Sequence, residues 1–173
     1  MKNPSSVLFL ILCIINVRTY KIKTKDYNDT QRSEKLLNIY WRNVMKHEVM
    51  KVFAAYRDAL EKGDFAGAFA TMSDTVVWHM GGESSLSGTI TGKQALGERL
   101  GEFAKRSGGT FKVITNWAAN NECFVAASVV SVAEKGADKL NDPGIDLFKI
   151  ENGKIQEVWT FAEQQSAEDT FWG

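Results

Sequence analysis

Two pairs of β-rich segments near the C-terminus, each joined by a turn signal, constrain the fold of this chain more than any other feature. The expected strands span residues 110–118 and 123–134, then 144–151 and 154–161. Asn152-Gly153 joins the second pair, and this dipeptide is the strongest short hairpin signal. No helix-length segment separates these strands, so parallel crossovers between them are excluded and the sequence predicts an antiparallel sheet.

Helical periodicity dominates the region before these strands. Residues 45–62 carry Val49, Phe53 and Tyr56 on one stripe, which predicts an amphipathic helix. A short helix capped by Asp64, a strand over 75–80 and a helix over 93–106 are expected to follow. The prediction is therefore an α+β fold, a cone-shaped barrel of a curved antiparallel sheet wrapped around three N-terminal helices, with a hydrophobic pocket at its open end.

Composition changes near Met45. Residues 1–45 contain no Gly or Ala and carry eight Lys/Arg against three Asp/Glu, whereas the rest carries thirteen against eighteen. We expect residues 1–44 to be a poorly ordered, non-native or signal-like extension, or a basic arm, and residues 45–173 to be the domain. The apolar run 7–17 is too short to span a bilayer. It fits a secretory signal without a good cleavage site. The domain is thus cytoplasmic if Met45 is the functional start, or secreted or membrane-associated if the run acts as a signal.

Several classes of function are disfavoured by composition. The formal net charge is zero, so nothing indicates a nucleic-acid partner or a membrane contact through the domain. Two Cys and two His residues support neither a disulfide framework nor a metal site, and no phosphate-binding loop motif is present. No cofactor is predicted.

Three segments together resemble a known superfamily. They are residues 56–64 (YRDALEKGD), 76–81 (VVWHMG) and 153–159 (GKIQEVW). In order and spacing, the region from about 45 to 173 is similar to the nuclear transport factor 2-like superfamily, in its SnoaL-like and ketosteroid isomerase-like branch. The resemblance implies a homodimer with a pocket for a small apolar or aromatic molecule. The superfamily contains isomerases, polyketide cyclases, dehydratases, epoxide hydrolases and pure binding modules, so the fold alone does not give the function.

Three candidate catalytic residues follow from this resemblance. Tyr56 matches the first-helix tyrosine of ketosteroid isomerases and Asp146 their late-strand Asp, while His79 stands where those enzymes have a carboxylate base. Imidazole is an adequate base near neutral pH, but the substitution puts steroid isomerisation itself in doubt. Each residue also has a structural alternative: Tyr56 as core, His79 as a satisfied strand residue, and Asp146 as a solvated strand start.

Strand alternation supports Asp146 independently. It places Asp146 with Phe148 and Ile150 and away from Lys149, and a carboxyl group on an apolar face is costly unless it is paired or protonated. Two functions stay open: a cofactor-free acid–base enzyme of the isomerase, cyclase or dehydratase type, or a non-catalytic ligand-binding or protein-interaction module. Convergence of Tyr56, His79 and Asp146 on one point would favour the enzyme, and side chains that point into separate environments would favour the module.

Overall fold

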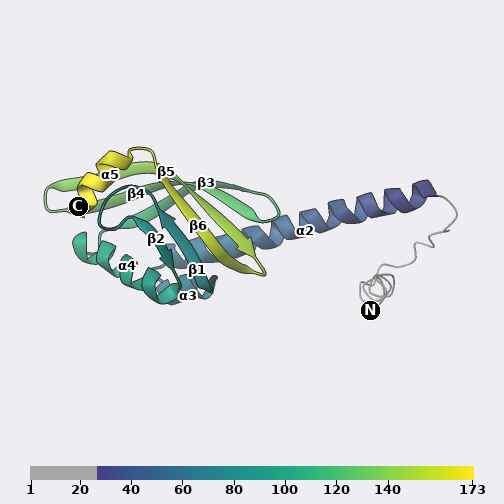
Figure 1. Ribbon diagram of the computed structural model, residues 1–173, viewed down its shortest axis with the longest axis horizontal. Helices are drawn as coiled ribbons and strands as arrows, with labels where there is room; N and C mark the ends of the chain where they lie inside the picture. The colour runs from purple at the N-terminus through teal and green to yellow at the C-terminus, as the bar shows by residue number, and fades with distance from the viewer. Residues whose placement is uncertain (1–26) are drawn as a thin grey trace. The chain divides into compact units, whose positions relative to one another are not determined.

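The computed structural model describes residues 27–173 (Figure 1). The elements are α2 (Tyr27–Glu61), α3 (Phe65–Ala70), β1 (Met72–Met80), β2 (Gly88–Thr91), α4 (Lys93–Arg106), β3 (Lys112–Asn120), β4 (Phe124–Lys135), β5 (Asp138–Glu151), β6 (Lys154–Ala162) and α5 (Gln165–Trp172). The α+β class is confirmed. Residues 1–39 and 40–173 form separate units, and the sheet, the core and the cavity described below belong to the second.

Helix α2 begins earlier than the composition predicts. It starts at Tyr27 rather than at Met45, so part of the expected poorly ordered extension is helical. No Gly or Pro occurs between residues 5 and 62, and therefore nothing in the sequence stops the helix before Gly63. The apolar run 7–17 lies outside the described residues. Across residues 27–173, no helix is both long and apolar enough to cross a bilayer.

The six strands form one curved sheet in the order β2-β1-β6-β5-β4-β3. Asn152 and Gly153 both have positive φ, at 54° and 70°, and close the predicted hairpin between β5 and β6. Strand β2 forms between the expected strand over 75–80 and the expected helix over 93–106, where no strand was predicted. The prediction of a wholly antiparallel sheet is wrong at one place, because β1 pairs with β6 in parallel. These two strands are separated by every other strand and by α4, which is ample chain for a crossover.

The core lies between the helices and one face of the sheet. Phe53 on α2, Leu96 on α4 and Phe148 on β5 are among its most buried side chains, with exposed fractions of 2% or less. A second apolar cluster, which includes Phe103, Phe171 and Trp172, joins α4 to α5. Helix α4 packs against β1 and β2, and α5 packs against β5 and β6.

Candidate functional site

A cavity of about 770 Å³ occupies the space between the helices and the concave face of the sheet. Its walls include Phe53 and Tyr56 from α2, Trp78 from β1, Phe148 from β5 and Trp172 from α5. The volume is within the roughly 300–1,000 Å³ range of small-molecule sites. The predicted apolar pocket is therefore present, and the question is which polar groups face it.

One row of paired residues crosses the concave face and carries polar groups into this cavity. Ala127, Asp146, Thr160 and Met80 are successive cross-strand partners on β4, β5, β6 and β1, and all four line the cavity. Because side chains alternate along a strand, every member of such a row points to the same face. The predicted inward face of β5 is confirmed, since Asp146, Phe148 and Ile150 are all buried.

Asp146 is the acidic member of this row. Its exposed fraction is 8%, and no hydrogen bond or ion pair to its carboxyl group forms within residues 27–173. Burial, followed by the nearby negative charge of Glu168, raises the pKa of Asp146 to about 7. Near neutral pH this carboxyl group therefore exists in both protonation states, which suits a group that accepts and returns a proton.

Tyr56 lines the same cavity from α2. Its ring lies 5.5 Å from Phe148 and 6.5 Å from Trp78 between centroids, so the core interpretation of this residue is partly right. It is only half-buried by area because part of its surface lines the cavity, yet it is withdrawn from bulk water. Burial, and then the charge of Asp146, raises the pKa of the Tyr56 hydroxyl well above its usual value. The hydroxyl is therefore a neutral hydrogen-bond donor.

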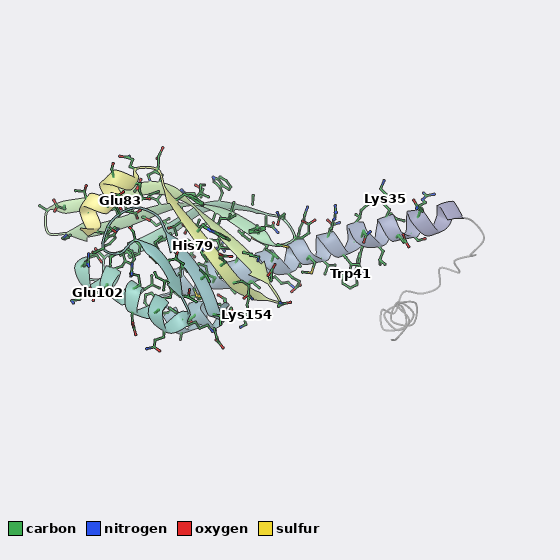
Figure 2. All side chains as sticks on the ribbon, viewed as in Figure 1. Lys35, Trp41, His79, Glu83, Glu102 and Lys154 are labelled. Atoms are coloured by element: carbon green, nitrogen blue, oxygen red, sulfur yellow. The ribbon has the colours of Figure 1, made fainter. Side chains whose placement is uncertain are left out.

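His79 does not share this site, so the three candidate residues do not converge on one point, and only Tyr56 and Asp146 line the cavity. It pairs with Trp159 on β6 and Thr89 on β2, in a row that faces away from the cavity. Its Nε2 lies 2.8 Å from Glu157 Oε1, its Nδ1 lies 3.0 Å from Thr89 Oγ1, and its ring stacks on Trp159. Figure 2 shows His79 on the sheet beside β6. The neighbours Trp78 and Met80 point inward, so His79 points outward.

Two further carboxyl groups, which the sequence analysis did not select, line the cavity near α5. Asp142 lies on β5 four residues before Asp146, so the two side chains share the inward face of the strand. The predicted strand began at residue 144, whereas β5 begins at Asp138, and alternation along the longer strand would have identified Asp142. Glu168 comes from α5, and no pattern in the sequence brings that helix to β5. Burial and then the charge of Asp142 raise the pKa of Glu168.

Some buried polar atoms on the cavity wall lack a protein partner. Within the part of the chain that the structure describes, Trp78 Nε1 and Asp142 Oδ2 make no hydrogen bond. Trp172 Nε1 also makes none of normal geometry, but it lies close enough to Glu168 to lower the pKa of that carboxyl group. Buried polar groups are normally satisfied, and an orphaned set on a cavity wall points to a bound molecule or to water.

Metal binding has no support at this site. Among residues 27–173, no group of three or more His, Cys, Asp or Glu side chains is arranged to hold a metal ion. The cavity offers a proton-exchanging carboxyl group, a neutral hydroxyl and two further carboxyl groups on a wall that is rich in apolar side chains.

Comparisons with known proteins agree with this geometry. The family model described as "SnoaL-like domain" matches residues 53–158. A Xanthomonas campestris protein of unknown function with a cystatin-like fold is 32% identical, with a TM-score of 0.69 over 72% of this chain and 98% of its own. No curated protein matches the chain.

Two more distant solved structures share the fold. A putative polyketide cyclase from Xanthomonas campestris is 17% identical, with a TM-score of 0.56 over 75% of this chain and 99% of its own. A LEH-like epoxide hydrolase from M. tuberculosis is 20% identical, with a TM-score of 0.53 over 73% of this chain and 88% of its own. At these identities the similarity establishes the fold alone.

Proposed function

Because the chain belongs to the SnoaL-like family, we propose that it is a cofactor-free acid–base enzyme acting on a small, largely apolar molecule held in the cavity. One observation carries the proposal: Asp146 and Tyr56 face the same cavity, and neither has a hydrogen-bond partner within the described chain. A structural carboxyl group this deeply buried would be expected to have partners. Two solved structures with this fold are described as a putative polyketide cyclase and an epoxide hydrolase, which is compatible with such chemistry.

The proposed chemistry is proton transfer at a carbon next to a carbonyl group. The Asp146 carboxylate accepts the proton as the C–H bond breaks, and the electron pair moves toward the carbonyl oxygen. Tyr56 donates a hydrogen bond to that oxygen and stabilises the developing negative charge. Return of the proton from Asp146 to another carbon completes an isomerisation. Attack of the enolate carbon on a second carbonyl carbon of the same molecule, with the proton passing from Asp146 to the new alkoxide, completes a cyclisation. Transfer of the proton to a β-hydroxyl group, which leaves as water, completes a dehydration.

The pKa of Asp146 fits this role. A proton carrier works best when its pKa lies near the operating pH, and the value of about 7 meets that condition. Because the carboxylate is the active base, kcat/KM in the parent should rise with pH and level off above about 7.

The experiment begins with a thermal-shift screen of enones, small steroids and polyketide-like aromatic compounds. Compounds that bind are then tested for turnover by the parent and by Asp146→Asn and Tyr56→Phe. We expect Asp146→Asn to lower kcat by about 10²–10⁴-fold. Tyr56→Phe keeps the ring packing and should lower kcat by removing the hydroxyl alone.

The matched control is His79→Ala, which changes a titratable side chain of the same sheet outside the cavity. Its turnover should equal that of the parent. Parent-like turnover by Asp146→Asn would refute the assignment of the base. Tight binding with no turnover by the parent would favour a ligand-binding module of the same fold.

A further inference from the structure

The end of the cavity next to α5 carries two carboxyl groups, Asp142 and Glu168, that the proposed proton transfer does not use. Asp142 has an exposed fraction of 4%. Its Oδ1 accepts a hydrogen bond from the Gln164 backbone N–H at 3.1 Å, while its Oδ2 is buried without a partner in the described chain. Glu168 lies near enough for the two charges to repel. An unpaired carboxylate oxygen in such surroundings is costly unless a donor reaches it.

No protein cation compensates these carboxyl groups. None of the ion pairs formed within residues 27–173 involves Asp142, Asp146 or Glu168. Basic side chains of the cavity wall serve elsewhere: Lys62 and Lys112 are exposed, and Arg57 contacts Asp58 at 2.6 Å and Glu61 at 3.7 Å.

Two more basic residues approach α5 but do not reach its carboxylates. Lys135 Nζ donates to the Phe171 backbone carbonyl at 3.2 Å, and Arg106 donates to that of Trp172. Both therefore stabilise the C-terminal end of α5, where cations are favourable. The excess negative charge at this end of the cavity stays available to a ligand.

Aromatic rings enclose the same end. Trp172 packs edge-on against Phe103 at 4.7 Å and against Phe111 at 5.3 Å between centroids, and all three residues line the cavity. A cation is stabilised by a neighbouring aromatic face as well as by a carboxylate. An apolar body attached to the cation would bury its surface against these rings.

We infer that the molecule bound in this cavity carries a protonated amine, which pairs with Asp142 and Glu168 while its apolar or aromatic body fills the space toward Tyr56. The inference rests on the proposed function and specifies the substrate class of that same site. It assigns Asp142 and Glu168 to ligand binding, separate from the proton transfer by Asp146.

Binding of three probes with one ring system tests the inference. The probes are 2-naphthylmethylamine, 2-naphthalenemethanol and 2-naphthoate, which differ in charge but share an apolar body. Isothermal titration calorimetry at pH 7.5 with the full chain should give the amine at least a tenfold lower Kd than the alcohol, and the carboxylate the weakest binding. A charged hydrogen bond is strong enough for a difference of this size.

The variants Asp142→Asn and Glu168→Gln remove the two charges without changing side-chain size. Each should weaken amine binding by at least tenfold and leave alcohol binding within about twofold of the parent. The control Glu163→Gln removes an exposed carboxylate that does not line the cavity, and it should bind all three probes as the parent does. If Asp142→Asn loses alcohol binding as well, its cavity is damaged, and Glu168→Gln alone decides.

Equal affinity of the parent for amine and alcohol, or parent-like amine binding by the deciding variants, would overturn the inference. So would a parent that binds none of the three probes. Turnover is not measured in this experiment. If the amine-binding inference fails, the proposed acid–base role of Asp146 and Tyr56 therefore still stands. If that acid–base role is refuted instead, the expected affinities for the three probes do not change.

Discussion

Replacing Asp146 with Asn should stabilise the protein at high pH, although the same change should abolish turnover. The pKa of this buried carboxyl group is about 7 in the folded protein, against an ordinary value of 3.8. The folded state therefore holds the proton more tightly than the unfolded state does. Stability from this group is fully present below pH 3.8 and is lost as the pH rises through 7. The Asn side chain stays neutral at every pH, so the variant does not undergo this loss of stability as the pH rises.

The magnitude follows from the two pKa values. Their difference corresponds to about 4 kcal/mol of destabilisation once Asp146 is ionised, at about 1.36 kcal/mol per pKa unit. Of this total, about 2.5 kcal/mol is lost between pH 5 and pH 8.5, because the unfolded chain is already mostly ionised at pH 5. The free energy of unfolding of Asp146→Asn, relative to the parent, should rise by that amount across this range.

Urea denaturation at pH 5, 6, 7 and 8.5, followed by tryptophan fluorescence, measures this difference. With a urea m-value of about 2 kcal/mol/M, the midpoint advantage of Asp146→Asn should grow by about 1 M over the range. The control is Asp138→Asn, which removes an exposed carboxyl group at the start of the same strand. A parent–variant difference that is constant from pH 5 to pH 8.5 would refute the reasoning.

Three other predictions concern the scaffold. Gly144→Ala should lower the free energy of unfolding by about 1–3 kcal/mol, because its new methyl group would collide with the Phe161 backbone carbonyl. The control Gly101→Ala adds a methyl group on the open surface of α4 and should not destabilise the protein. An equal effect of the two changes would contradict the argument. We propose a homodimer through the outer sheet row that includes Trp117, which is 56% exposed. Light scattering at tens of micromolar should give the mass of a dimer for the parent and of a monomer for Trp117→Arg. A monomeric parent would exclude the homodimer. Residues 45–173 expressed alone should melt within a few degrees of the full chain. Within residues 27–44, the truncation removes the ion pair from Arg42 to Glu122 in the β3–β4 turn at 3.6 Å, and that pair is exposed. An insoluble product would show that residues 1–44 are needed.

Local sequence signals predicted most of the elements around the cavity. The stripe with Val49, Phe53 and Tyr56 identified the buried face of the first helix, and Asn152-Gly153 identified the β5–β6 hairpin. Alternation identified Asp146 as an inward carboxyl group among apolar residues. These features depend on residues close together in the chain, whose spacing alone decides the face that they share.

Only the tertiary structure decided which faces and ends come together. Alternation along TVVWHM puts Val76, Trp78 and Met80 on one face and His79 on the other, but only packing decided which face lines the cavity. The parallel pairing of β1 with β6 and the approach of Glu168 to Asp142 join segments far apart in the chain. Such contacts depend on the folding of the whole sheet, and no local pattern of residues encodes them.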